Sequence, residues 1–78
     1  MNEYYKTSDL FLAVTISLWF PLDSIDKSNP NRAEFIFKRE TKLDELVESY
    51  WRGEISVEPK QFASQIKIIK TRLYDHSI

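Results

Sequence analysis

The sequence predicts a small α+β domain in which a β-hairpin packs against three helices, in the order helix, strand, strand, helix, helix. Three observations give this class. Capping residues precede an apolar run at residues 10–20, a β-branched and aromatic segment follows a turn-forming stretch, and two later segments repeat apolar residues at helical spacing. We expect one domain over residues 1–78, with helices at about 8–18, 41–52 and 59–74 and the hairpin at about 20–38.

The first predicted helix is apolar on every side. After a polar and aromatic lead-in at residues 1–6, its start is marked by three capping residues, Thr7, Ser8 and Asp9. Its apolar residues form two opposite stripes, Leu10, Val14 and Leu18 on one side and Leu12, Ile16 and Trp19 on the other. A helix that is apolar all round must be covered all round. Either a second copy covers the Leu12 stripe, or the hairpin covers one side and the two later helices the other.

The hairpin follows Pro21, which ends the first helix. Its first strand, about residues 20–26, lacks a clean alternation of apolar and polar residues. Residues 27–31 read Lys-Ser-Asn-Pro-Asn, which is typical of a turn. The second strand, residues 32–38, alternates well, with Ala33, Phe35 and Phe37 on one face and Glu34, Ile36 and Lys38 on the other.

The two later helices are amphipathic. Thr41 opens the second, with Asp44 as a variant of the capping box. Its apolar arc consists of Leu43, Leu46, Val47, Tyr50 and Trp51. Gly53, the only glycine, suits a left-handed C-cap, and Pro59 suits the first turn of the next helix. The buried stripe of the third helix is Phe62, Ile66, Ile69 and Leu73, with Ile68 alone on the outer face.

The later helices carry opposite charge. Residues 40–54 hold two basic and five acidic side chains, a net charge of −3, and residues 58–75 hold four basic and two acidic, a net charge of +2. The simplest explanation is mutual compensation between antiparallel neighbours.

Composition excludes several kinds of chemistry. The 78 residues contain no cysteine, one glycine and one histidine, His76. Disulfides, thiolate zinc sites, His-rich metal sites and glycine-rich phosphate loops are therefore excluded. We expect no enzymatic activity, no catalytic, cofactor-binding or metal-binding residues, and no bound cofactor. The apolar run at residues 10–20 is too short to span a membrane, which takes about 20 residues, so we expect no membrane partner. The absence of cysteine fits an intracellular protein, and we expect a cytoplasmic location.

A set of residues in fixed order resembles a known family. They are Tyr5, Thr7, Ser8, Asp9, Leu10, Leu12 and Ala13, then Phe35, Ile36 and Phe37, then Leu43, Leu46, Val47, Tyr50, Trp51, Gly53, Val57, Glu58 and Pro59, and finally Lys70, Leu73 and Tyr74. Their order and spacing resemble DUF5659, a small bacterial and phage family of unknown function. The resemblance covers most of the chain and implies a compact α+β module, common in phage and other mobile genomes, with no established activity. The chain departs from the family pattern at residues 18–21.

The preferred functional hypothesis is a protein-interaction module that forms a homodimer, as an accessory or regulatory protein of a phage or mobile element. Five Phe, four Tyr and two Trp exceed what a small core readily hides, and aromatic residues are typical interface anchors. The predicted interface is Leu12, Ile16, Trp19, Phe20 and Trp51. The alternative is nucleic-acid binding by the third helix, through Lys60, Lys67, Lys70, Arg72 and Tyr74, although 11 basic against 12 acidic residues argue against a dedicated binder.

Overall fold

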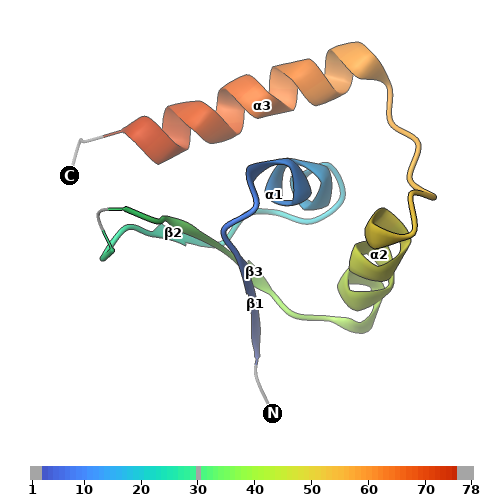
Figure 1. Ribbon diagram of the computed structural model, residues 1–78, viewed down its shortest axis with the longest axis horizontal. Helices are drawn as coiled ribbons and strands as arrows, with labels where there is room; N and C mark the ends of the chain where they lie inside the picture. Colours follow the sequence, from blue (N-terminus) through green and yellow to red (C-terminus); the bar gives the residue numbers. More distant parts are fainter. Residues whose placement is uncertain (1–2, 30, 76–78) are drawn as a thin grey trace.

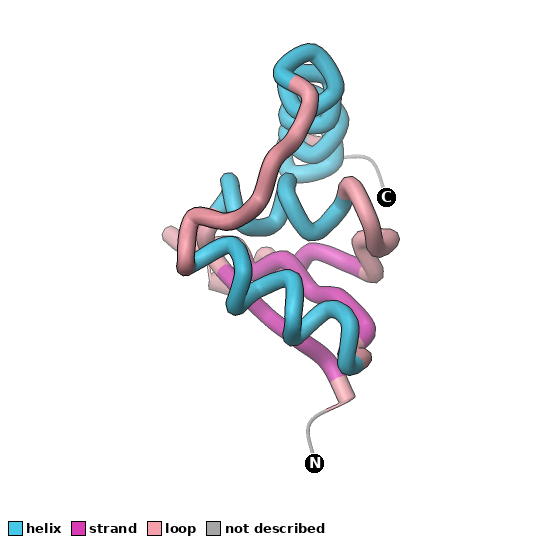
Figure 2. Tube along the Cα trace, turned by 90° about the vertical axis from the view of Figure 1, so that its right-hand side faces the viewer, coloured by secondary structure: helices cyan, strands magenta, loops and turns pink. Residues whose placement is uncertain are grey.

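The fold is a three-stranded sheet with three helices, and a computed structural model describes it over residues 3–29 and 31–75. The elements are β1 (Tyr4–Thr7), α1 (Leu10–Ser17), β2 (Ser24–Asp26), β3 (Glu34–Lys38), α2 (Thr41–Trp51) and α3 (Pro59–Tyr74). The strands form one antiparallel sheet in the order β1–β3–β2. Figure 1 shows α1 between the sheet and α3, with α2 to one side, and Figure 2 shows the same layers from the side. The predicted α+β class is confirmed.

β1 is the element that sequence reasoning missed. The interpretation of residues 1–6 as a simple lead-in is wrong, because Tyr4–Thr7 pair with β3, with Tyr5 opposite Phe37 and Thr7 opposite Phe35. The partner residues lie 28 to 34 positions further along the chain, so no turn motif announces the pairing. Thr7 also prepares the next element, since its Oγ1 accepts a hydrogen bond of 3.0 Å from the Asp9 N–H.

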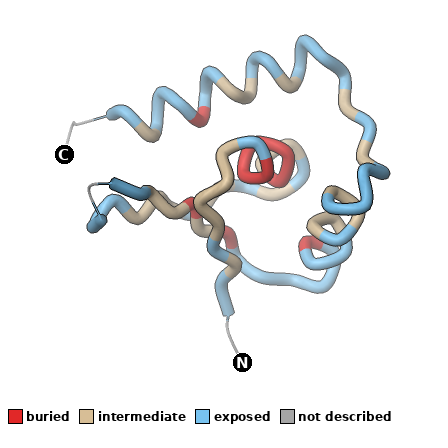
Figure 3. Tube along the Cα trace, viewed as in Figure 1, coloured by how far each residue is buried: buried red, intermediate tan, exposed pale blue. Residues whose placement is uncertain are grey.

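α1 is the centre of the core. Its residues 12–16 are all buried, and Figure 3 shows this helix as the most buried part of the chain. Asp9 caps the helix, since its carboxylate accepts a hydrogen bond of 3.1 Å from the Leu12 N–H. The sheet, α2 and α3 each pack against a different side of α1, as the views in Figures 1 and 2 agree. The chain therefore covers residues 12–16 of its most apolar helix by itself.

The expectation that Leu12 and Ile16 face a partner is wrong. Leu12 is 1% exposed and Ile16 is 0% exposed within the single chain. Of the two arrangements that the sequence leaves open, the structure adopts the one in which the sheet covers one side and the later helices the rest. α1 spans only eight residues, so a few neighbouring elements are enough to bury its residues 12–16, although Phe11 near its start stays 56% exposed.

The hairpin is shorter than predicted. Its first strand covers only Ser24–Asp26, and a loop of seven residues, 27–33, joins it to β3. Residues 20–22 do not extend the strand, because Phe20 still donates its N–H to the Ile16 carbonyl of α1 (2.9 Å) and Pro21 has no N–H to give a sheet. Asp23, directly before β2, already donates its N–H to the Ile36 carbonyl of β3 (2.9 Å). The alternation of β3 is as predicted, with Phe35 and Phe37 buried at 2% and 0% exposure. Pro30, in the predicted turn, lies outside the described residues.

Local signals place α2 and α3 well. Gly53 has a φ of +72° directly after α2, and two hydrogen bonds close the cap, from the Gly53 N–H to the Tyr50 carbonyl and from the Glu54 N–H to the Ser49 carbonyl (both 3.0 Å). This is a Schellman motif, which favours glycine at the left-handed position. α3 has the predicted bounds. The predicted capping box of α2 is wrong, since Glu40 is its N-cap and makes no side-chain cap.

Two long side chains attach the far end of α3 to the hairpin region. Lys27 donates from Nζ to the carbonyls of Arg72 (3.3 Å) and Asp75 (3.0 Å), where the end of a helix leaves carbonyls without intrahelical partners. Arg72 donates from Nη1 to the Leu22 carbonyl (3.3 Å). Residues 76–78 lie outside the described part of the chain. No helix within the described residues is long and apolar enough to cross a membrane.

The central position of α1 predicts that shortening Ile16 is costly. Ile16→Ala is expected to lower the free energy of unfolding by about 2–5 kcal/mol, because it removes a fully buried side chain and leaves a cavity. Ile68→Ala is the matched control, since Ile68 is 52% exposed on α3, and it is expected to change stability by less than about 0.5 kcal/mol. Urea denaturation measures both. Equal losses in the two variants would contradict this account of the core.

Candidate functional site

The predicted interface residues do not form one surface. Leu12 and Ile16 are in the core, whereas Trp19 is 52% exposed and Trp51 is 64% exposed. Phe20 is half-buried and packs against the core. Only Trp19 and Phe20 remain together, where the chain leaves α1.

These two aromatic residues line a groove against one side of α2. The groove has a volume of about 300 Å³ and is lined by Trp19, Phe20, Lys42, Glu45, Leu46 and Ser49. We call these six residues the Trp19 groove. The turn after α1 explains the geometry: both Trp19 and Phe20 donate their N–H groups to the Ile16 carbonyl (3.0 and 2.9 Å), so the backbone stays tightly wound at this point. Phe20 then packs against the core, and Trp19 keeps half of its surface in solvent.

Sequence reasoning found the two aromatic residues and missed the α2 side of the groove. Lys42, Glu45, Leu46 and Ser49 recur at i, i+3, i+4 and i+7, the spacing of one helix face, and this spacing was the available signal. Their proximity to Trp19 depends on the packing of α2 on α1, which no local pattern reveals.

Trp51 belongs to a different surface. It lies nine positions after Lys42, which is about two and a half helical turns, so it points to the opposite side of α2 from the groove. Its ring meets the Tyr50 ring edge-on, with centroids 5.1 Å apart. A partner that binds only in the Trp19 groove would therefore not contact Trp51, and for such a contact the prediction of a shared interface is wrong.

The basic flank of α3 is only partly as predicted. Lys60, Lys67 and Lys70 are all exposed, and Tyr74 is 65% exposed at the end of the helix. Arg72 does not join them, because its guanidinium reaches the Leu22 carbonyl. Tyr74 and Lys70 help to line a shallow pocket near the end of α3.

The charges of α2 and α3 do not compensate each other. The ion pairs of the α2 region join Asp44 to Arg39 (3.3 Å) and Arg52 to Glu48 and Glu54 (3.9 and 3.1 Å). No ion pair between α2 and α3 occurs within residues 3–29 and 31–75. The expected mutual compensation is wrong, because α2 and α3 pack on different sides of α1.

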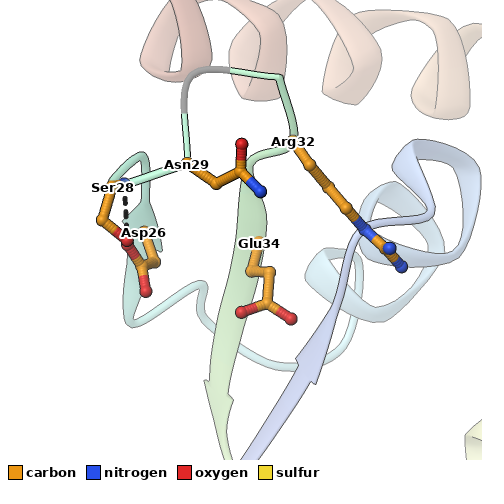
Figure 4. Close-up of a pocket in the computed structure, with 5 residues that line it drawn as sticks. All are labelled: Asp26, Ser28, Asn29, Arg32 and Glu34. Carbon is orange, nitrogen blue, oxygen red and sulfur yellow. Dashed lines mark hydrogen bonds between the residues drawn. The ribbon is translucent and has the colours of Figure 1, made fainter.

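A polar pocket at the hairpin loop was not anticipated. Asp26, Ser28, Asn29, Arg32 and Glu34 line about 310 Å³ (Figure 4). Asp26 and Glu34 are direct cross-strand partners, and like charges in that position oppose each other. Arg32 points away from them in Figure 4. Its Nε donates a hydrogen bond of 3.0 Å to the Ser8 Oγ. In the part of the chain that the structure describes, no three acidic, His or Cys side chains gather as metal ligands.

The Asp26 carboxylate is held in its charged form by its own turn. The Ser28 N–H donates to Asp26 Oδ1 at 2.9 Å, and this backbone hydrogen bond, together with the Ser28 hydroxyl, lowers the pKa of Asp26. Burial acts weakly in the opposite direction, and Lys6 helps to lower the pKa. These hydrogen bonds are typical of a stable turn at Asp26 and Ser28, and they do not form an acid–base pair.

The fold and these surfaces define a small α+β domain with an aromatic groove, a basic helix flank and a polar hairpin pocket. The family described as "Domain of unknown function (DUF5659)" matches residues 2–75, and the chain belongs to this family. The resemblance noted from the sequence is thereby confirmed. No curated protein and no solved structure matches the chain.

The lowered pKa predicts how Asp26 affects stability in acid. Because the folded state has the lower pKa, Asp26 stabilises the fold at neutral pH, and this contribution is lost as the pH falls through the folded-state pKa, below about pH 4. Asp26→Asn keeps an oxygen that accepts from Ser28 but removes the titration, so the urea midpoint of this variant is expected to fall less steeply with acid. Ser28→Ala removes only the hydroxyl, so the fall of its urea midpoint with acid is expected to be intermediate between those of the native chain and Asp26→Asn. Identical acid profiles for the native chain and Asp26→Asn would refute the assignment.

Proposed function

We propose that this chain is a non-enzymatic protein-interaction module that binds through the Trp19 groove, and that its partner is a second copy of the chain. The observation that supports this most is the exposure of Trp19. A tryptophan with half of its surface in solvent, beside Phe20 and Leu46, offers the large apolar contact that interface hot spots use.

The charges around the groove favour a second copy as the occupant. Lys42 and Glu45 line the same groove and both are exposed, so its rim carries one positive and one negative charge. In a two-fold interface the same patch meets itself, and each residue of a pair contacts the other residue on the partner. Lys42 of one copy then faces Glu45 of the other, and the aromatic residues meet near the axis. A rim of this kind is complementary to itself in charge.

The proposal differs from the expectation drawn from the sequence in its residues. Leu12 and Ile16 are withdrawn because the chain buries them, and Trp51 is left outside the contact. Trp19 and Phe20 are kept, and the α2 face is added. An accessory or regulatory role in a phage or other mobile element, and a cytoplasmic location, remain part of the proposal; they rest on the composition and on the family resemblance.

Truncating Trp19 tests the groove. The native chain is expected to sediment as a dimer at micromolar concentration, and Trp19→Ala is expected to weaken the dimer by roughly 30-fold or more, the effect of losing a hot-spot aromatic residue. Trp51→Ala is the matched control, because it removes a second exposed tryptophan that lies outside the groove, and it is expected to leave the mass unchanged. A native chain that stays monomeric at about 100 μM would overturn the proposal, because this concentration is far above the usual dissociation constant of a specific dimer.

Charge reversal tests the two-fold arrangement separately. Lys42→Glu or Glu45→Lys alone places like charges across the axis and is expected to weaken the dimer. The double exchange Lys42→Glu with Glu45→Lys restores opposite charges across the axis and is expected to recover most of the affinity. Failure of the double exchange to recover affinity would show that the two residues do not meet across an axis.

Nucleic-acid binding by α3 is the second candidate, and one observation favours it. Lys60, Lys67 and Lys70 are exposed and form no ion pair within the described residues, so their charge is available to phosphate. Tyr74, largely exposed beyond them, offers a ring for a base to stack on. Arg72 is withdrawn from the predicted set, because it is engaged at Leu22.

The second candidate predicts a steep dependence of affinity on salt. Binding to a single-stranded oligonucleotide is expected to weaken by about 10-fold or more between 50 and 200 mM salt, and Lys60→Glu with Lys67→Glu is expected to abolish it. Lys42→Glu is the control, since it reverses a lysine of α2, and it is expected to have little effect. Fluorescence anisotropy measures all three. This candidate would be rejected if the affinity did not change with salt, or if Lys42→Glu weakened binding as much as Lys60→Glu with Lys67→Glu does.

A further inference from the structure

A cleft lies beneath the connector that joins α2 to α3. It has a volume of about 280 Å³ and is lined by Thr15, Tyr50, Gly53, Ile55, Val57 and Phe62. These residues come from α1, α2, the connector (residues 52–58) and α3. Figure 1 shows the connector arching beside α1 from the end of α2 to the start of α3. The cleft exists because α2 and α3 pack on different sides of α1 and the connector has to bridge them.

The lining of this cleft carries no charge. The other three pockets described for this chain each contain at least two charged side chains, and 29% of all residues are charged. An ion placed against Ile55, Val57 and Phe62 would lose water without gaining a charged partner, which is costly. The chemistry of the walls therefore selects a neutral and mainly apolar occupant.

One side-chain donor in the lining is available to such an occupant. The Thr15 hydroxyl donates to the Phe11 carbonyl at 2.8 Å, so its hydrogen is already engaged. The Tyr50 hydroxyl makes no hydrogen bond to any described residue. Burial raises the pKa of Tyr50, with a further contribution from Asp9, so the phenol stays protonated at neutral pH and keeps its donor. A ligand oxygen can accept from it.

The connector can move outward to admit a ligand to the cleft. Within the described residues, the N–H groups of Ile55, Ser56 and Val57 donate no hydrogen bond. Ile55 and Val57 are half-buried, so they close one side of the cleft through apolar contact alone. This wall can move outward without breaking a backbone hydrogen bond from these residues.

We propose that the cleft under the connector binds a neutral, mainly apolar small molecule that carries a single hydroxyl or carbonyl oxygen. The ring or alkyl part packs against Ile55, Val57 and Phe62, and the oxygen accepts a hydrogen bond from the Tyr50 hydroxyl. This binding does not depend on the Trp19 groove, so it can be present whether the chain is a monomer or a dimer.

Benzyl alcohol and benzoate are suitable probes, because they match in size and differ in charge. In a titration followed by ¹H–¹⁵N NMR, benzyl alcohol is expected to shift the amide signals of Thr15, Ile55 and Val57, with a dissociation constant of about 1 mM, which is ordinary for a ligand this small. Benzoate is expected to bind at least about 10-fold more weakly. Equal binding of both probes, or no shift of these signals by benzyl alcohol, would overturn the proposal.

Three variants locate the binding. Val57→Phe fills the cleft and is expected to abolish the shifts. Tyr50→Phe keeps the ring but removes the donor, and is expected to weaken benzyl alcohol roughly 2- to 10-fold. Ile36→Phe enlarges a half-buried side chain on β3, outside the cleft, and is expected to leave binding unchanged. Undiminished binding in Tyr50→Phe, or loss of binding in Ile36→Phe, would place the ligand elsewhere and contradict the assignment.

Discussion

Enclosure of α1 by its own chain is the constraint on which the rest of this structure depends. Residues 12–16 of this eight-residue helix are all buried, and each fully buried aliphatic side chain contributes about 1.5–3 kcal/mol. No single element can cover a helix that is apolar on every side. The sheet, α2 and α3 are therefore distributed around α1, and each contributes one apolar face to it (Figure 3).

This distribution determines which surfaces remain free. Because α2 and α3 lie on different sides of α1, the acidic side of α2 and the lysines of α3 do not neutralise each other. The bridge between the two helices leaves the uncharged cleft beneath the connector. The turn that ends α1 leaves Trp19 at the edge of α2. The groove, the lysine flank and the cleft are thus three consequences of one packing arrangement, and they offer contacts of three different chemical kinds.

Much of the fold follows from local signals, and what was missed depends on distant contacts. α3 has its predicted bounds because Pro59 and its apolar spacing act locally, and Gly53 ends α2 for the same reason. β1 pairs with residues about thirty positions away, which no local pattern announces. Trp19 and Phe20 were expected at a surface contact, yet Lys42 and Glu45 were not, because their place in the groove depends on the packing of α2. The apolar character of Leu12 and Ile16 showed that both must be covered, but it did not show whether the same chain or a second copy covers them.

Native-state hydrogen exchange of the α1 amides tests the central claim most directly, if it is measured on a monomer. In the Trp19→Ala variant, at a concentration where it sediments as a monomer, enclosure by the same chain predicts that the Val14, Thr15 and Ile16 amides still exchange only through global unfolding, because no second copy takes part in covering them. Exchange of these amides in the monomer that is much faster than global unfolding would contradict the account, since it would mean that covering α1 requires a neighbouring molecule.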